Sequence, residues 1–568
     1  MYVKITTSGP RRYVQLLESF RDEHGRVKKR TVATLGRVDQ LGAELDSVIE
    51  GLLKIRGRAP SATADAHVAP SLSFESARAL GNVWALTELW NELGFGRLRE
   101  VFRRTRHAID VEALIRLMVL NRLCDPDSKL GVLRWLQTVA LPDMALSSVT
   151  HQQLLRTMDA LSDHQERVDQ VVAGLLRPMM DHDLSLAFYD MTTIRSEGLC
   201  TVEGDVRKYG MAKEGLIARQ FMLGVVQTAE GLPIYHEVFD GNTAEAKTLL
   251  PVLNKVMERF PNLRRLVLVA DRGLLSLDNL EQLQKLTLPN GQALEFIIAV
   301  PGRRYSEFVE LLEPLGQQCA EATQEITAEL KWNDLRLVLA HDPVAALEQR
   351  QKRQTKINEL EARANAWVGK LGEQDQGGAR RRGRKLSDSG AKARFYHEVR
   401  ESHLGRIIKV DLKGELFNYS INEQALSLAQ MIDGKLLLVT NVKDLKPQQI
   451  IARYKSLADI ERGFKVLKSE LEIGPIYHRL PERIRAHAAI CFMALILHRV
   501  MRQRLREANT GISPERALQA LKRIQHLRVS INAAEPLAAV SSMTQQDDAL
   551  LSALGVKPPS QTQQLCIL

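Results

Sequence analysis

The sequence predicts a mixed α/β protein with an RNase H-like core, preceded by a small β-rich unit and a helical domain. Three observations support this fold class. Residues 1–40 resemble short strands separated by turns, and residues 75–182 repeat apolar positions at three- and four-residue spacing, as amphipathic helices do. From residue 183, strand-like and helical segments follow in the order β-β-β-α-β-α-β, which is the order in which an RNase H-like fold begins.

After residue 301 the alternation of strands and helices stops, so we expect an insertion in the core. A long charged helix and a basic low-complexity stretch fill this part of the sequence, and an apolar strand follows them. The predicted segments are a β-rich N-terminal unit at 1–56, a linker at 57–74, a helical domain at 75–182, the first part of the core at 183–301, an insertion at 302–432, the second part of the core at 433–506 and a helical tail at 507–568.

The composition excludes several classes of protein. The chain has 568 residues, of which 45% are hydrophobic and 26% charged, so a dominant disordered state is excluded. Its five cysteines are far apart, which argues against a disulfide framework or a Cys-ligated zinc site and favours a reducing cytoplasm. The sequence begins without the apolar stretch of a signal peptide, and its most apolar run, Ala488–Leu497, is about half as long as a membrane span. We therefore expect a soluble, cytoplasmic protein.

Basic residues outnumber acidic ones, 78 to 68, and the net charge of +10 is compatible with a polyanionic partner. They gather in the N-terminal unit, at residues 97–106 and at residues 380–385. Each stretch either contacts nucleic acid phosphates or forms a solvated surface, and the sequence leaves both interpretations open. In the third stretch, the side chains expected to follow phosphates are Arg380, Arg381, Arg382, Arg384 and Lys385.

Two aspartates stand at predicted strand ends. Asp190 ends the first core strand in YDMTT, and Asp271 ends the fourth in VADRG. In an RNase H topology the first and fourth strands are neighbours, so both carboxylates would lie within reach of one cation at the sheet edge. A single Asp at a strand end is more often a turn or capping residue, but two on adjacent strands favour a site.

A third carboxylate comes from a predicted helix after the insertion. Tyr454, Glu461 and Lys468 are seven residues apart, which leaves about 20° of drift, so all three project from one face. An apolar stripe beside that face would hold the helix on the sheet. Lys465 lies roughly 40° away from it. On the helix pattern alone, a surface helix with a Glu461–Lys465 ion pair stays an open alternative.

These blocks, YDMTT, VADRG and the helix with Glu461, resemble the three catalytic blocks of DDE transposases in the insertion sequence 4 superfamily. That superfamily carries a signature of Tyr, Arg, Glu and Lys, and this chain has Leu457 where the Arg is expected. The subgroup that it most resembles is the insertion sequence 1634 group. The stretches that carry this resemblance are ATLG at 33–36, RLCDPDSKL at 122–130, HEVFDGNTAE at 236–245 and YHRLPERIRAH at 477–487.

The resemblance implies a transposase that acts on double-stranded DNA, at the terminal inverted repeats of its element and at target DNA. Asp190, Asp271 and Glu461 would be catalytic and would hold two Mg²⁺ ions, with Mn²⁺ as a substitute, since Mg²⁺ prefers carboxylate oxygens. The resemblance further implies a homodimer on DNA, no membrane partner and a nucleoid-associated, cytoplasmic location. The side chains expected to contact the DNA backbone are Tyr454, Lys468 and Lys465.

Two other functions stay open on the sequence. One is an RNase H-like nuclease that cuts DNA without joining it. The other is a non-catalytic DNA-binding protein derived from a transposase. Three converging carboxylates would repel phosphate, so a protein that only binds DNA has no need of them.

Overall fold

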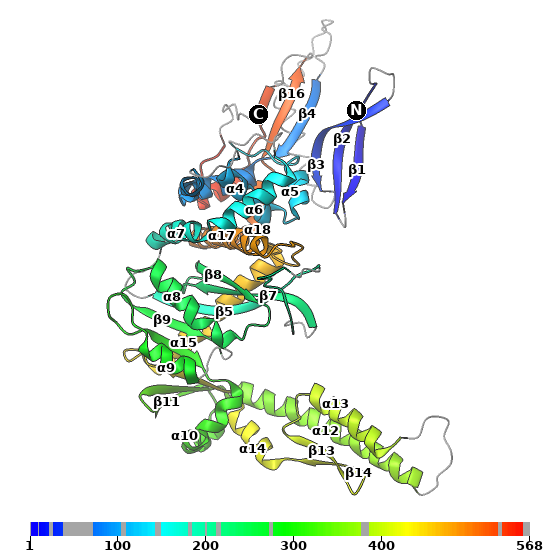
Figure 1. Cartoon of the computed structure of the whole chain (residues 1–568), viewed down its shortest axis with the longest axis vertical. Helices are drawn as coiled ribbons and strands as arrows, with labels where there is room; N and C mark the ends of the chain where they lie inside the picture. The colour runs from blue at the N-terminus through cyan, green and yellow to red at the C-terminus, as the bar shows by residue number, and fades with distance from the viewer. Residues whose placement is uncertain are drawn as a thin grey trace. The chain divides into compact units, whose positions relative to one another are not determined.

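The computed structural model describes twelve stretches of the chain (Figure 1). They are residues 2–8, 11–21, 27–37, 72–103, 109–142, 149–179, 185–198, 202–211, 217–271, 277–375, 386–531 and 537–559. The fold is mixed α/β with a small β-rich N-terminal region, as predicted. Two compact units share the chain. Unit 1 comprises Met1–Leu266, Thr287–Gln292 and Ala458–Leu568, and unit 2 comprises Val267–Leu286 and Ala293–Leu457.

The N-terminal region of unit 1 is an antiparallel sheet of three strands, drawn in blue in Figure 1. Its strands are β1 (Tyr2–Ser8), β2 (Arg11–Arg21) and β3 (Val27–Arg37). Tyr13, Leu17 and Thr34 are buried, and β3 packs against β4 (Leu72–Ala79). The short strands expected in residues 1–40 are therefore present, and part of their sheet is covered.

The helices of unit 1 pack around one long apolar helix, α17 (Pro481–Glu507). Among the described residues, α17 is the one helix long and apolar enough to cross a membrane by length and composition, but 94% of its most apolar window is buried in the protein. Such burial is typical of a core helix that is hydrophobic all round. The other helices of the N-terminal half are α2 (Gly81–Glu92), α3 (Leu98–Phe102), α4 (Val111–Cys124), α5 (Lys129–Trp135), α6 (His151–Asp163) and α7 (Gln165–Leu176).

Two predictions about the flanks of this helical part are wrong. Residues 72–79 form β4, although a linker and then a helix were expected there, and the tail after residue 507 is not wholly helical. β4 pairs with β16 (Gln525–Ile531), which in turn pairs with β17 (Leu537–Val540). Because these partners are so distant in sequence, no local pattern indicates the pairing. The helices of the tail are α18 (Pro514–Leu521) and α19 (Gln545–Ala553).

A second sheet region of unit 1 carries the first core strands. β5 (Ser185–Arg195) pairs with β7 (Ile217–Gln227), and β7 also pairs with β6 (Lys208–Met211) and β8 (Pro233–Asp240). Tyr189 on β5 donates a hydrogen bond of 2.7 Å to the hydroxyl of Thr248, which precedes helix α8 (Leu249–Arg259). Burial raises the pKa of Tyr189, so the hydroxyl stays a donor. One face of the sheet is thus packed against α8.

Unit 2 contains a sheet in the order β9-β10-β15-β12-β11. β9 and β10 are parallel, and the other pairs are antiparallel. The strands are β9 (Leu266–Ala270), β10 (Glu295–Ala299), β11 (Ile326–Trp332), β12 (Leu335–His341) and β15 (Lys435–Thr440). The expected insertion at 302–432 therefore does not lie wholly outside the sheet, because β11 and β12 continue it. β12 is an apolar, largely buried strand that pairs with β11 and β15 and is contacted by α15 (Pro447–Lys455).

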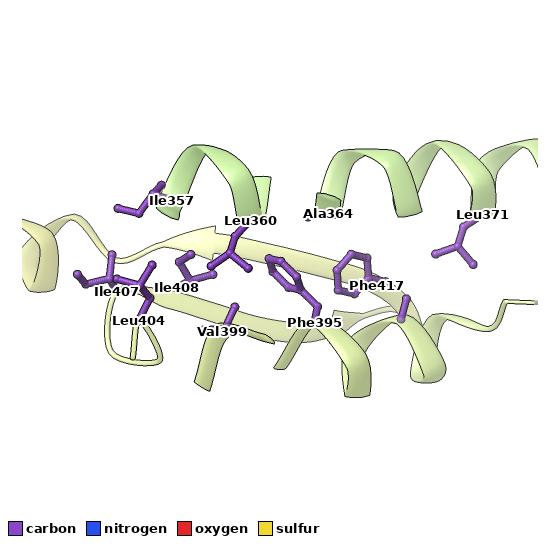
Figure 2. Packing of buried hydrophobic residues seen from close by; sticks show 11 residues of the cluster. Ile357, Leu360, Ala364, Leu371, Phe395, Val399, Leu404, Ile407, Ile408 and Phe417 are labelled. Atoms are coloured by element: carbon purple, nitrogen blue, oxygen red, sulfur yellow. The ribbon is translucent and has the colours of Figure 1, made fainter. Parts of the chain in front are cut away.

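The rest of the segment 302–432 has a hydrophobic core of its own (Figure 2). The ring of Phe395 is fully buried and makes edge-on contacts with Trp367, Phe417 and Tyr419. Helices α12 (Pro343–Asp375) and α13 (Asp388–Glu401) pack there with a hairpin of β13 (Ile408–Lys413) and β14 (Leu416–Ile421). The remaining helices of unit 2 are α9 (Leu277–Lys285), α10 (Val309–Leu312), α11 (Gly316–Glu321), α14 (Glu423–Ile432) and α15 (Pro447–Lys455).

Candidate active site

Asp190 lies in the middle of β5, not at its end as the sequence predicted. The strand runs on through Thr192, Thr193 and Ile194 to Arg195, because these β-branched residues extend the pairing with β7. Asp190 stands opposite Val225, and its Oδ1 accepts a hydrogen bond of 2.7 Å from the backbone amide of Met191. The Asp190 side chain is half-buried. Its chain neighbours Tyr189 and Met191 point to the other face of the sheet, where their side chains are buried.

The face of the sheet that carries Asp190 also carries Gln227. Gln227 pairs with Phe188, and side chains two residues apart on a strand point to the same side, so Phe188, Asp190 and Gln227 share a face. This face is opposite the one on which Tyr189 reaches α8. Val225, the direct partner of Asp190, pairs on its other side with His236, whose ring stacks on Phe492 of α17 at 4.4 Å.

Helix α16 (Ala458–Lys465) crosses this same face, which brings Glu461 to the side of the sheet with Asp190. The helix contacts β5, and Gly463 lies directly against Gln227. A Cβ atom at position 463 would come within 2.4 Å of the Gln227 amide nitrogen and 3.0 Å of an Arg499 guanidinium nitrogen. Only a glycine allows this approach without a shift. Glu461 stands two residues earlier, about 200° around the helix from Gly463, so its exposed side chain points away from Gln227.

Asp271 follows β9 directly, as predicted, and is half-buried. The Tyr454 hydroxyl donates a hydrogen bond of 2.7 Å to Oδ1 of Asp271. Tyr454 is near the end of α15, which packs on β10, β11 and β12 of the same unit. The sequence singled out Tyr454 as a DNA contact and gave no sign of this bond, because Asp271 is far away along the chain.

The prediction of one continuous helix carrying Tyr454, Glu461 and Lys468 on a common face is wrong. α15 ends at Lys455, a turn follows at 456–457, and α16 begins at Ala458. After α16 the chain forms a π-helical turn, Val466–Glu470, closed by a bond of 2.9 Å from the Leu471 amide to the Val466 carbonyl. Spacing of 100° per residue holds only in an uninterrupted α-helix, so the predicted common face and the position of Lys465 relative to it are lost.

Leu457, which stands where an Arg was expected, lies in the turn between the two helices. Its side chain is 7% exposed, so it packs as an apolar residue at the turn. Lys465 and Lys468 are both exposed. Arg380, Arg381 and Arg382 lie outside the described residues, as do Arg384 and Lys385.

The three predicted carboxylates are divided between the units, with Asp190 and Glu461 in unit 1 and Asp271 in unit 2. In the part of the chain that the structure describes, no group of three or more His, Cys, Asp and Glu residues is placed to hold a metal ion. The donors themselves suit Mg²⁺, which takes carboxylate oxygens and keeps several waters in its shell. Asp190 and Asp271 are half-buried and Glu461 is exposed, so water and substrate oxygens have access to all three.

Comparison with protein families gives the class of the chain. Residues 182–497, more than half of its length, match the model of the transposase DDE domain, and the three carboxylates fall inside this match. Residues 3–65 match the N-terminal domain of IS1634 family transposases. The chain therefore belongs to the IS1634 family of DDE transposases.

Among solved structures, the chain is similar to a piggyBac transposase in a synaptic complex with hairpin DNA, studied by cryo-electron microscopy. The identity is 10%, the match covers 78% of each chain, and the TM-score is 0.34. A similarity this low carries no argument about the present chain. No curated protein matches it.

Proposed function

We propose that this protein binds the terminal inverted repeats of its insertion sequence and catalyses Mg²⁺-dependent DNA cleavage and strand transfer through Asp190, Asp271 and Glu461. The observation that carries the proposal is the match of residues 182–497 to the transposase DDE domain, since all three acids lie within it. Helix α16, which carries Glu461, packs on the face of β5 that carries Asp190, and this supports assigning both acids to the same side of the sheet.

We also propose that the core is RNase H-like. The succession β5, β7, β8, α8, β9, α9 and β10 supports this, because it follows the order predicted from the sequence apart from the short added strand β6. Residues 302–432 are then an addition to that core, in which β11 and β12 extend the sheet and α12 to β14 form a separate hydrophobic core.

The residues of the proposed site have distinct tasks. Two Mg²⁺ ions, when bound by the three carboxylates, would stabilise charge on the attacking and leaving oxygens of a phosphodiester. Asp190 is held by a paired strand, so its position is set by the sheet. Tyr454 orients Asp271 by its hydrogen bond to Oδ1. The exposed ammonium groups of Lys465 and Lys468 neutralise DNA phosphates near the cleaved bond.

Two further features belong to the proposal. Because transposition joins two ends of one element, the active form is a homodimer on DNA. The protein acts in the cytoplasm, on nucleoid DNA.

The test is a cleavage and joining assay with the full-length protein. A labelled duplex that carries one end of the element, taken from the DNA flanking the coding region, is incubated with Mg²⁺ and a target plasmid. Joining of the label to the plasmid supports the proposal. Cleavage without joining would indicate a nuclease, and tight binding without either reaction would indicate a non-catalytic DNA-binding protein.

A further inference from the structure

The β2–β3 hairpin extends beyond the part of the N-terminal sheet that is packed in unit 1. Leu17 and Ala33 are buried, whereas every residue of Ser19–Arg21 and Val27–Thr31 is exposed. These two stretches, called the ribbon below, stay paired as Ser19 with Lys29, Phe20 with Lys28, and Arg21 with Val27. Side chains of paired strands alternate between the two faces, so exposure of every residue means that both faces of the ribbon are open.

The ribbon is strongly basic. Four of its eight residues are cationic and none is acidic: Arg21, Lys28, Lys29 and Arg30. The sequence of the turn that joins the two strands adds one cation and two acids, Arg26, Asp22 and Glu23, so the hairpin as a whole stays basic. On the strands themselves, Glu18 accepts a hydrogen bond of 2.8 Å from Arg30 at the base of the ribbon. Residues 1–37 as a whole contain nine Lys and Arg against three Asp and Glu, which gives +6 of the chain's net charge of +10. The charge favours a polyanion as the partner.

Each face of the ribbon also presents an apolar side chain directly opposite a cation. Phe20 is 42% exposed and stands opposite Lys28, and Val27 is 59% exposed and stands opposite Arg21. The Arg30 guanidinium lies 5.8 Å from the centre of the Phe20 ring, on the same face. Exposed apolar groups flanked by cations suit a ligand that offers apolar contacts between two negatively charged borders. They suit less well a ligand whose surface is uniformly charged.

We propose that the ribbon inserts into the major groove of duplex DNA. The major groove is about 12 Å wide and accepts a two-stranded β-ribbon, whose strands lie about 4.8 Å apart. Cations at the ribbon's edges would reach phosphates on the two borders of the groove, while the face that carries Phe20 would meet base edges such as thymine methyl groups. This inference rests on the proposed function, in which DNA is the substrate, and names the part of the chain that grips the duplex.

The experiment compares two double variants of the full-length protein with equal loss of charge. Lys28→Gln/Lys29→Gln removes two cations from the ribbon, and Lys4→Gln/Arg12→Gln removes two exposed cations from the part of the same sheet outside the ribbon. Binding of a short fluorescein-labelled duplex of mixed sequence is measured by anisotropy at several salt concentrations. The slope of log K against log[salt] is negative, and the ribbon variant should make it less steep by about 1.8, or roughly 0.9 for each lost phosphate contact. The control variant should change the slope by less than half of that amount.

Two outcomes overturn the proposal. One is an equal effect of the two double variants, which would mean that only net charge matters. The other is equal competition by a single strand of the same length, which has no major groove. Phe20→Ala adds a third arm, because it leaves the charge unchanged and should weaken binding without altering the salt slope. Circular dichroism of each variant confirms that the sheet is intact.

Failure of this inference can be told from failure of the proposed function. If wild type and ribbon variant bind duplex alike while wild type cleaves and joins the element's end, the ribbon is wrong and the transposase activity stands. If the ribbon variant loses duplex binding but wild type neither cuts nor joins, the ribbon stands and the activity is wrong.

Discussion

The three acidic residues of the proposed site have different surroundings. Asp190 is fixed in a paired strand, Asp271 is held by a tyrosine hydroxyl, and Glu461 projects from a helix into solvent. The position of Asp190 is fixed by strand pairing and that of Asp271 by a side-chain hydrogen bond, whereas the position of Glu461 depends on where α16 lies.

Replacement of any one of the acids by its amide should abolish cleavage. Asp190→Asn, Asp271→Asn and Glu461→Gln each remove a proposed metal ligand and keep the size of the side chain, so DNA binding and folding should persist. We expect losses of about 10⁴-fold or more, the scale on which removal of a catalytic group acts. The measurement is single-turnover cleavage of the labelled element end with saturating Mg²⁺. A variant that cleaves at near the wild-type rate would remove that residue from the site.

Tyr454→Phe tests a role that the sequence did not indicate. The variant deletes the hydroxyl that donates to Asp271 Oδ1, and loss of a bond that orients a metal ligand commonly costs 10- to 100-fold in metal affinity or activity. The Mg²⁺ concentration for half-maximal cleavage should therefore rise by about 10- to 100-fold. If Tyr454 instead served only as a DNA contact, the Mg²⁺ requirement would stay constant and DNA affinity would fall.

A matched control exists in the same unit. Tyr419 donates a hydrogen bond of 3.1 Å to the Asn365 side chain, far along the chain from the three acids. Tyr419→Phe removes an equivalent hydroxyl, so it should leave the Mg²⁺ requirement unchanged.

At the scale of the element, the strands could be predicted and the helix continuity could not. The strands after residue 183 are apolar runs between turn residues in the sequence. This pattern correctly predicted that Asp271 follows directly after a strand. The break between α15 and α16 falls at Ser456 and Leu457, where neither Gly nor Pro interrupts the pattern. The π-helical turn that follows likewise has no local signal. Helix α15 packs on β10, β11 and β12, α16 contacts β5, and the π-helical turn contacts α17. These partners are distant in sequence, so no local window contains them.

The approach of α16 to the sheet depends on Gly463. Gln227 is fully buried, so its amide cannot swing into solvent to make room for a Cβ at 463. Gly463→Ala should therefore destabilise the protein by about 1–3 kcal/mol, the usual cost of overpacking, and reduce cleavage by displacing Glu461. The measurements are urea unfolding and the cleavage rate.

Two further variants isolate the cause. Gly174 also lies within a helix of unit 1, but nothing lies near its missing Cβ, so Gly174→Ala should be neutral or slightly stabilising. Adding Gln227→Ala to Gly463→Ala should recover part of the lost cleavage, because the obstacle is gone. A Gly463→Ala protein as stable and active as wild type would show that α16 does not need this close packing.

At the scale of the whole molecule, unit 1 contains several buried histidines that resist protonation. Burial lowers the pKa of His236 to about 4, with Glu237 raising it and Arg259 lowering it, and burial also lowers the pKa of His526 to about 4. Both values are below the usual His value of about 6.5 in an unfolded chain. Below about pH 6.5 these histidines bind protons in the unfolded chain but stay neutral in the folded protein, so acid favours unfolding.

Stability should therefore fall as the pH drops from about 6.5 towards 4, by up to roughly 1.4 kcal/mol per pH unit for each such histidine. His236→Phe keeps the ring stacked on Phe492 and removes one of these protons, so it should flatten the decline by about that amount. Urea unfolding at pH 7, 6 and 5 measures it. An unaltered decline in His236→Phe would contradict the assignment.

The mixed α/β class and the β-rich N-terminal region were the part of the whole-molecule organisation that sequence patterns could predict. The expected linker end and wholly helical tail were wrong, and the pairing of β4 with β16 shows why such boundaries are hard to draw. Alternation within Leu72–Ala79 indicates an extended strand only once its partner is known, and that partner lies near the other end of the chain.

This pairing has a consequence for how the protein is made. β4 leaves the ribosome early, but β16 begins at Gln525, and α17, on which α4 and α6 pack, begins only at Pro481. At usual rates of synthesis of about 5–20 residues per second, the early helices wait tens of seconds for the segments that bury them. A gene copy with a stop codon before residue 481 thus yields a chain without its central helix. If the proposed function holds, such damaged copies would leave unfolded chains for proteases to remove, rather than folded fragments that occupy the DNA ends of intact copies.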